Sequence, residues 1–312
     1  MSAPFNRSFL TRGPAIVTYA GATLFTRGDI VPRHAPGWED VVTSMYGRVD
    51  RAKKDLVLKI GLPLFGNWTN LSVLFPSYAM NPVTGTSVFG AGDVPLVIQA
   101  RNSDVITYAN AQLTKISNLH LGVDNELFSA DAEFTGLIGN TANPEDANAY
   151  YTMSTSAYTD ATFAKTTFLK ARFTAAWGSL SGFSSFVGEK GFAIDWDLQM
   201  KPVYVEGYGT RDMTITDMVA SCKGIPVVPT IAQLEAQAQA QGTAVGSLLS
   251  ALPATGTDLV LTGGGHSITL KTASIIEHGY AFGQEPLRLG EVTWQTTRGF
   301  AVGVPAVVAA VS

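Results

Sequence analysis

Asp195 and Asp197 are the two side chains whose spacing is best suited to chemistry. They lie two positions apart in GFAIDWDLQMKPV, whose alternating apolar and polar residues predict a half-buried strand. Because residues at that spacing share one face of a strand, the two carboxylates could bind a cation or act as an acid–base pair. A solvated acidic edge is the other interpretation. The pair also lies too close along one strand to flank a glycosidic bond as a glycosidase requires.

The remaining reactive side chains show no catalytic or metal-binding pattern. His120 and His278 lie in comparable regions of the two halves of the chain, so a shared site and two ordinary hairpin positions are both open. No histidine belongs to an HExxH or Cys/His metal motif. Ser247 lacks the flanking glycines of a nucleophile elbow, and the glycines at 263–265 lack the lysine of a phosphate loop. We therefore expect no enzyme activity, no cofactor and no metal.

Composition favours a folded protein that meets other protein. The chain has 312 residues, 46% of them hydrophobic, yet only 15% are charged, which leaves little charge to spread over a solvated surface. The net charge of −4 disfavours nucleic-acid binding, which depends on basic groups. Cys222 is the single cysteine, so no intramolecular disulfide forms and a reducing cytoplasm suffices for folding. We expect no signal peptide and no membrane helix, because no apolar run is long enough.

Basic residues crowd the first sixty positions, and the remainder is correspondingly acidic. A solvated face and a charge-complementary interface between copies both fit this imbalance. The basic residues are Arg7, Arg12, Arg27, Arg33, Arg48, Arg51, Lys53, Lys54 and Lys59.

The elements around these residues repeat along the chain. The stretch DLVLKIGLPLF, from Asp55, has the same alternation as the strand that carries Asp195. Matched positions follow the same order in both halves, which predicts a tandem duplication. The matches are Leu56 with Phe192 at an offset of 136, Leu96 with Leu259 at 163, Ile106 with Ile268 at 162, Phe134 with Trp294 at 160, and Ile16 with Phe173 at 157. The unequal offsets predict surface insertions at 28–53 in the first copy and 202–258 in the second.

Strands joined by hairpins predict a mainly β fold, a sandwich or a barrel. We expect a first domain at 1–139 with an N-terminal arm, a linker at 140–171 that wanders over the surface, and a second domain at 172–312. Each domain would carry a short flanking helix. One is expected from Pro229 to about Gln241, capped by Thr230, within a helical insertion near 229–250; the other lies in GNWTNLSVLFP, residues 66–76.

Several stretches carry a resemblance to a known family. RGPAIVTYAGATLFTRGDI, GRVDRAKKDLVLKIGLPL, WTNLSVLFP, GTSVFG before LVIQ, and GFAIDWDLQMKPVYVEGYGTRDMTITDMVASCKGIPV resemble the major tail tube proteins of long-tailed bacteriophages and prophages. The similarity runs through nearly the whole chain and lies in the character and order of the segments. It involves no diagnostic motif, since this family has no active-site signature. It implies two tandem tail-tube-like β-sandwich or barrel domains that assemble into stacked rings around a lumen for DNA. Three chains would supply six domains, and the insertions would reduce sixfold symmetry to threefold.

The resemblance also implies partners and contacts. The chain would bind itself, a tape measure protein inside the tube, a tail terminator and tail-tip or baseplate proteins at the ends, with DNA as a transient cargo in a lumen that is acidic or neutral. It would assemble in the host bacterial cytoplasm and reside in the virion tail. Contacts between subunits or rings are expected at Arg7, Arg12, Arg48, Arg51, Lys53 and Lys54. A tail-tip or baseplate ring, or a carbohydrate- or host-binding β-sandwich using Tyr150, Tyr151 and Tyr158, is the alternative.

Overall fold

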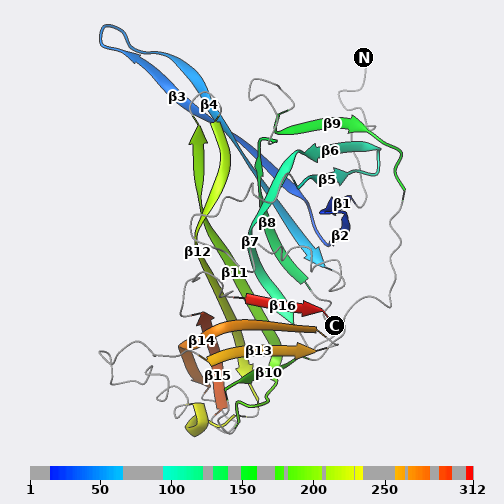
Figure 1. Cartoon of the computed structure of the whole chain (residues 1–312), viewed down its shortest axis with the longest axis vertical. Helices are drawn as coiled ribbons and strands as arrows, with labels where there is room; N and C mark the ends of the chain where they lie inside the picture. Colours follow the sequence, from blue (N-terminus) through cyan, green and yellow to red (C-terminus); the bar gives the residue numbers. More distant parts are fainter. Residues whose placement is uncertain are drawn as a thin grey trace, which may run out of the picture.

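The structure, a computed structural model, is almost entirely β (Figure 1). It describes residues 15–65, 94–121, 129–139, 149–159, 173–178, 182–205, 209–227, 229–234, 257–263, 266–281, 288–296 and 307–311. The predicted mainly β class is therefore confirmed. None of the helical residues among these ranges forms a segment long and apolar enough to cross a membrane.

Among the described residues, nine strands come from the first half of the chain and seven from the second. The first half contains β1 (Ile16–Tyr19), β2 (Ala22–Thr26), β3 (Val31–Thr43), β4 (Gly47–Phe65), β5 (Leu96–Gln99), β6 (Asp104–Tyr108), β7 (Asn110–Leu121), β8 (Ser129–Leu137) and β9 (Tyr151–Thr155). The second half contains β10 (Thr174–Trp177), β11 (Gly188–Val205), β12 (Gly209–Pro226), β13 (Thr257–Gly263), β14 (His266–Ala281), β15 (Arg288–Thr296) and β16 (Val307–Val311).

Alternation of apolar residues explains why these stretches are strands. On β11, Phe192, Ile194, Trp196 and Leu198 are buried while Asp197 and Gln199 are exposed, as the sequence predicts. On β4 the buried residues are Leu58, Ile60, Leu62 and Leu64. One continuous hydrophobic cluster contains the buried residues of both strands and spans both halves.

The sixteen strands of the described ranges belong to one antiparallel network. Its order is β10-β13-β14-β15-β12-β11-β7-β8-β4-β2-β1-β5-β6-β9, with β16 beside β14 and β3 beside β4. The two halves meet where β11 pairs with β7. Within each half the network folds back over its core: the ring of Tyr19 on β1 meets that of Phe134 on β8 at 4.8 Å, and Trp177 on β10 meets Trp294 on β15 at 6.2 Å.

The strand pairing of the first half recurs in the second, in a different alignment from the one predicted. Ile60 of β4 lies opposite Phe134 of β8, and Cys222 of β12 lies opposite Trp294 of β15. The equivalent of β4 is therefore β12, at an offset of 162, and the predicted match of Leu56 with Phe192 at 136 is wrong. The reason is that period-two alternation makes any two half-buried strands look alike.

With that alignment the two predicted insertions overlap. Pro32 of β3 lies opposite Ile60, as Ile194 of β11 lies opposite Cys222, again 162 positions later. At this offset residues 40–53 of the first predicted insertion correspond to residues 202–215 of the second. Each half contains a long hairpin, β3–β4 in the first and β11–β12 in the second, and neither is an addition to the other.

Two further expectations concern connecting segments. Within the predicted linker at 140–171, the described residues include β9, which pairs with β6 along its whole length, so this part does not wander. The described helix is Ile231–Leu234, at the predicted N-terminus. Thr230 Oγ1 accepts a hydrogen bond from Gln233 N at 3.2 Å, and Gln233 Oε1 accepts one from Thr230 N at 2.8 Å, a capping box. The rest of that helix and the one at 66–76 lie outside the described residues.

Candidate assembly interface

The Asp195 and Asp197 pair is part of the junction between the two halves. Asp195 Oδ1 accepts a hydrogen bond from the backbone N of Asn118 on β7 at 2.9 Å. Asp197 is exposed and lies opposite Lys115 of β7. No group of three or more His, Cys, Asp or Glu side chains that could hold a metal occurs among the described residues. The two carboxylates therefore help to join β11 to β7.

The two histidines that the sequence placed in comparable regions are not brought together. His120 lies on β7 opposite Ala193, whereas His278 lies on β14, with β15, β12 and β11 between these two strands. The strand pairing gives His278 a different equivalent, Ile116, 162 positions earlier. A shared histidine site is thus not formed, because the correspondence in sequence was four residues out of register.

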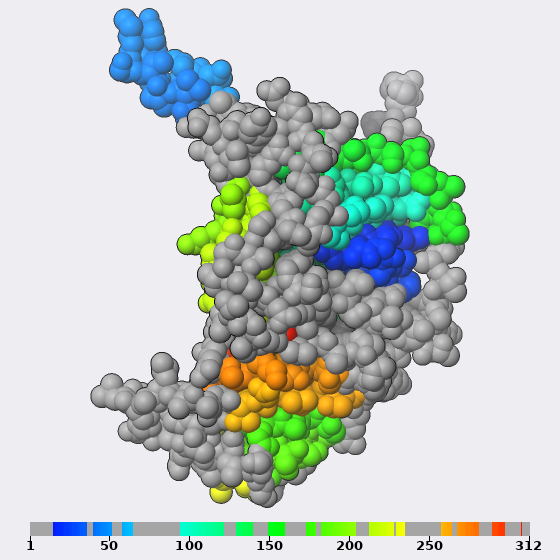
Figure 2. Space-filling model, in the orientation of Figure 1, coloured from blue at the N-terminus to red at the C-terminus, as the bar shows by residue number. Residues whose placement is uncertain are grey.

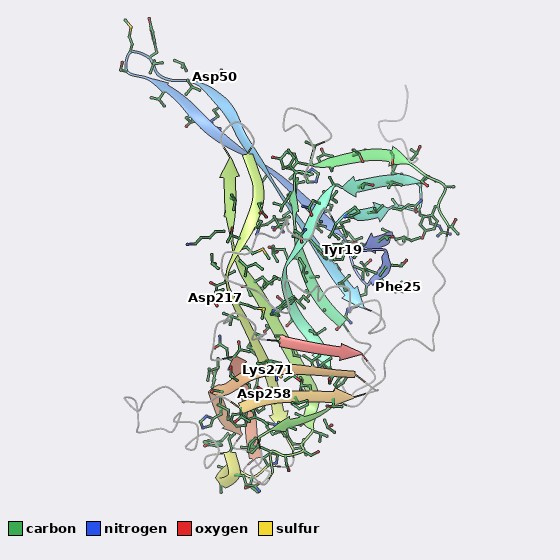
Figure 3. The ribbon with its side chains drawn as sticks, viewed as in Figure 1. Tyr19, Phe25, Asp50, Asp217, Asp258 and Lys271 are labelled. Carbon is green, nitrogen blue, oxygen red and sulfur yellow. The ribbon has the colours of Figure 1, made fainter. Side chains whose placement is uncertain are left out.

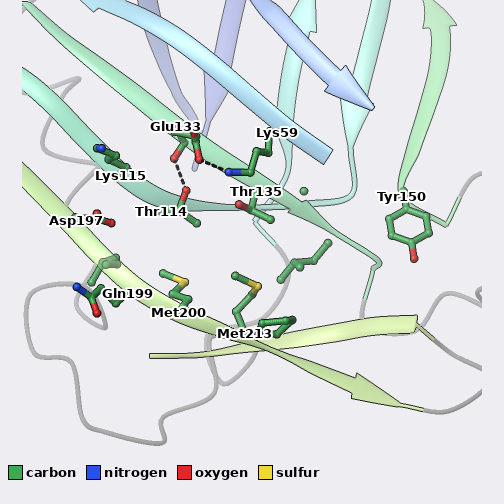
Figure 4. Close-up of a pocket in the computed structure, with 14 residues that line it drawn as sticks. Lys59, Thr114, Lys115, Glu133, Thr135, Tyr150, Asp197, Gln199, Met200 and Met213 are labelled. Carbon is green, nitrogen blue, oxygen red and sulfur yellow. Dashed lines mark hydrogen bonds and ion pairs between the residues drawn. The ribbon is translucent and has the colours of Figure 1, made fainter. Parts of the chain in front are cut away.

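A pocket of about 570 Å³ lies beside this junction (Figure 4). Its wall combines Lys59 and Glu133, whose Nζ and Oε1 atoms are 3.0 Å apart, with Met200 and Met213 of the β11–β12 hairpin. The backbone carbonyl of Glu133 accepts a hydrogen bond from Thr114 Oγ1 at 3.0 Å. Lys59 and Glu133 already pair with each other. The pocket is therefore best described as the place where the β11–β12 hairpin crosses the first half.

Cys222 of β12 is fully buried and lies opposite Ile194 of β11 and Trp294 of β15. Burial, and secondarily the negative charge of Asp195, raises the pKa of its thiol well above the usual range. Because the thiolate is the reactive form, we expect iodoacetamide at pH 8 to label the folded chain at least about a hundredfold more slowly than the urea-unfolded chain. Mass spectrometry of quenched samples measures both rates. Equal rates would show that Cys222 is accessible.

The junction between β7 and β11 is an apolar seam with a charged margin. Trp196 lies opposite Ile116 and Ile194 opposite Leu119, and all four side chains are buried. The next row places Asp197 opposite Lys115, a favourable cross-strand pairing of opposite charges. This is how one half of the chain attaches to the other.

Neither a family model nor a curated protein matches the chain.

Function must therefore be inferred from the strand edges, several of which lack a partner among the described residues, and two of these belong to the long strands β3 and β14. Among the described strands, β3 pairs with β4 alone, so its other edge carries no described strand. The C-terminal section of β14, residues 277–281, pairs only with β15 in the part of the chain that the structure describes. Unpaired edges are natural templates for another chain.

The arm, which we define as residues 40–51 at the end of the β3–β4 hairpin, projects from the body (Figure 2). It carries apolar side chains into solvent: Met45 is 79% exposed and Tyr46 73%. Figure 3 shows Asp50 on the same projecting hairpin. Exposed apolar residues gathered on a projecting element indicate a contact surface.

The predicted contact residues lie only partly on this arm. Arg48 and Arg51 are on it, and both contact Asp40, at 3.4 Å and 2.7 Å. These ion pairs are exposed, so each contributes no more than about 1 kcal/mol. Lys53 and Lys54 are on β4 just beyond the arm, and their side chains, like Arg7 and Arg12 altogether, lie outside what the structure describes. The sequence reading missed Met45 and Tyr46, although VVTSMYG is an apolar run in a charged segment.

One face of the long sheet is acidic. It is the face opposite the hydrophobic core, along the rows where β3, β4, β8, β7, β11, β12, β15 and β14 lie side by side. Among the described side chains there, carboxylates outnumber cations. The carboxylates are Asp131, Glu133, Asp195, Asp197, Asp212, Asp217, Glu277 and Glu291, and the cations are Arg33, Lys59, Lys115, Lys201 and Lys223.

The tyrosines suggested for glycan stacking do not form an exposed platform. The ring of Tyr151 lies 4.8 Å from that of His34 and 6.1 Å from that of Tyr108. Tyr150 lines the pocket, and Tyr158 is half-buried. A sugar would need an uncovered ring face, so this cluster gives no support to a carbohydrate-binding module.

Proposed function

We propose that this chain is a structural virion protein that assembles into rings, and the rings into the hollow tail tube of a long-tailed bacteriophage. The observation that carries the proposal is the repeated strand pairing of two halves that each offer an edge to the other. The halves are then a tandem duplication, and one chain fills two neighbouring places of a ring. The resemblance of the sequence to tail tube proteins supports the same function.

The assembly is head-to-tail. β11 of the second half pairs with β7 of the first, so the contact joins two different surfaces and leaves one of each unused at the ends of the chain. Contacts of this heterologous kind close into a ring when the rotation per copy divides a full turn. With two domains per chain, three chains complete a ring of six domains.

The acidic face suits the lumen of such a tube. Duplex DNA is retained by cations that neutralise its phosphates, whereas a surface with an excess of carboxylates repels it and lets it pass. DNA is then a transient cargo, without sequence-specific binding. The tape measure protein would occupy the lumen beforehand, and the terminator and tail-tip or baseplate proteins would bind the ends of the tube. Assembly takes place in the bacterial cytoplasm and the product is the virion tail.

Negative-stain electron microscopy of the purified, concentrated chain at physiological salt tests this function. We expect end-on views of rings with six lobes and side views of stacked rings. Rings that never stack would favour a tail-tip or baseplate ring protein with the same contacts. Chains that stay monomeric, even with tail components added, would contradict the proposal and move the interpretation to a binding module.

A further inference from the structure

We propose that β3 of one copy pairs antiparallel with the C-terminal section of β14 of the next copy, with His34 opposite His278 and Ala35 opposite Glu277. This rests on the proposed ring function and names its contact. The occupant of this β14 edge, which pairs with no strand on that side among the described residues, is a second copy of this chain. The argument is that the junction inside each chain is a template for the junction between chains.

The template is reliable because the register shifts in the strand ladders of the first half recur at the same offset in the second half. The β3–β4 ladder shifts register between Gly37 and Trp38, and the β11–β12 ladder shifts between Gln199 and Met200, in both cases 162 positions apart. The second shifts, after Val41 and after Val203, obey the same offset. Bulges depend on local backbone geometry, so their recurrence fixes β3 as the equivalent of β11 residue by residue.

The other strand of the junction obeys the same offset. The β7–β8 ladder is interrupted between Leu113 and Lys115, and the β14–β15 ladder between Ile275 and Glu277. Leu113 lies opposite Phe134 as Ile275 lies opposite Trp294. The C-terminal section of β14 is therefore the equivalent of β7.

The new contact follows when each strand of the β7–β11 junction is replaced by its equivalent. β11 is replaced by β3, 162 positions earlier, and β7 by the C-terminal section of β14, 162 positions later. Trp196 opposite Ile116 becomes His34 opposite His278, and Asp197 opposite Lys115 becomes Ala35 opposite Glu277. The second strand of each new pair is at the far end of the chain from the first. β3 and the C-terminal section of β14 lie far apart in the strand order of one copy. They cannot pair within that copy, so the contact is between two copies.

Exposure of equivalent residues agrees with a missing neighbour. Thr114, in the bulge of β7, is 9% exposed because the β11–β12 hairpin crosses over it, whereas its equivalent Ile276 in the bulge of β14 is 56% exposed. Trp196 is 2% exposed, and its equivalent His34 is exposed. An isoleucine that is more exposed than the equivalent threonine needs a cover, and the arm of the next copy lies in the position to supply it.

The chemistry of the new rows is complementary. Arg33 is two residues from Ala35 on the same face of β3, diagonal to Glu277, so opposite charges again meet at the margin of the junction. The sign is reversed relative to Lys115 and Asp197, with the cation now on the hairpin strand. Pro32 cannot donate a backbone hydrogen bond, which limits the pairing to a short stretch and disfavours indiscriminate strand addition.

Disulfide crosslinking of the full-length chain tests the register. Ala35→Cys with Glu277→Cys places two thiols in the proposed row, and Lys115→Cys with Asp197→Cys places them in the equivalent row within one chain. Opposite residues on paired strands have Cβ atoms about 4.5–5.5 Å apart, close to what a disulfide needs. The single native thiol, Cys222, is buried and does not interfere.

After mild oxidation, non-reducing electrophoresis should show a ladder of covalent multimers for the Ala35/Glu277 pair and closed monomers for the Lys115/Asp197 pair. Ala35→Cys with His278→Cys is out of row, and we expect about tenfold less multimer from it because a one-residue step along this regular part of the strand turns the side chain to the other face. Rings in the microscope without the ladder, equal ladders from both pairs, or covalent dimers alone would overturn the register and leave the ring function standing. Neither rings nor ladder, with the internal pair closed, would overturn both.

Discussion

A chain that lacks the arm is expected to stay folded and to form no rings. The change removes residues 40–51 and joins Glu39 to Ala52 through Asn-Gly, which suits a two-residue hairpin turn. Met45 and Tyr46 contribute almost nothing to the fold of a single chain because they are exposed, so we expect the melting temperature to change by no more than about 2 °C. Ring formation, measured by electron microscopy and sedimentation velocity, should be lost because the cover over Ile276 of the next copy is gone.

The matched control is the same truncation in the second half. It removes residues 202–213 and joins Lys201 to Thr214, which lie opposite each other as Glu39 and Ala52 do. That hairpin end packs against the first half, where Pro202 and Met213 line the pocket with Leu137 and Tyr150. We expect its loss to lower the free energy of unfolding by on the order of 2 to 4 kcal/mol. Equal effects of the two truncations on a single chain would contradict the assignment of the arm to a neighbouring copy.

Trp196→Ala is expected to be the most destabilising single change at the junction. The side chain is buried between β7 and β12, and its indole Nε1 contacts the sulfur of Met218. Truncating a buried tryptophan leaves a large cavity and costs about 3–5 kcal/mol. Urea unfolding, followed by tryptophan fluorescence and circular dichroism, measures the loss.

Its equivalent, His34→Ala, provides the comparison at the same position of the repeat. His34 is exposed, and its Nε2 atom makes one hydrogen bond, to the hydroxyl of Tyr108 at 3.1 Å. We expect a cost of about 1 kcal/mol or less in the single chain. Ring formation should weaken more than that, since the proposed row pairs His34 with His278. A large loss of single-chain stability for His34→Ala would show that the two positions are not equivalent in the way the strand pairing indicates.

The fold class and the strands could be predicted from the sequence, whereas their partners could not. Alternation identified the strand around Trp196, and the order of matched segments indicated a repeat. The match of Leu56 with Phe192 failed because alternation records which face of a strand is buried and carries no information on the strand beside it. Pairing is a long-range property. Only the position of Ile60 opposite Phe134 and Cys222 opposite Trp294 distinguishes β12 from β11 as the equivalent of β4.

The candidate interface was only partly predictable for a related reason. Arg48 and Arg51 stood out as charges, but the more informative residues are apolar ones in unusual places. Ile276 in KTASIIEHGY is indistinguishable in sequence from a core residue, and its exposure becomes meaningful only by comparison with Thr114. The contacts of Asp195 and Asp197 with Asn118 and Lys115 of another strand could not be predicted from their spacing in sequence.

The covalent link between the halves has a consequence for polymerisation. Because β7 and β11 belong to one polypeptide, they meet at a high effective concentration. Their junction can therefore be as hydrophobic as a protein core without being exposed to another polypeptide. The proposed contact between polypeptides would be built instead from histidines, a proline and the exposed Ile276. A contact with so little apolar surface is weaker than the internal junction, so we expect rings of the purified chain only at high protein concentration, whereas the internal junction forms in every folded chain.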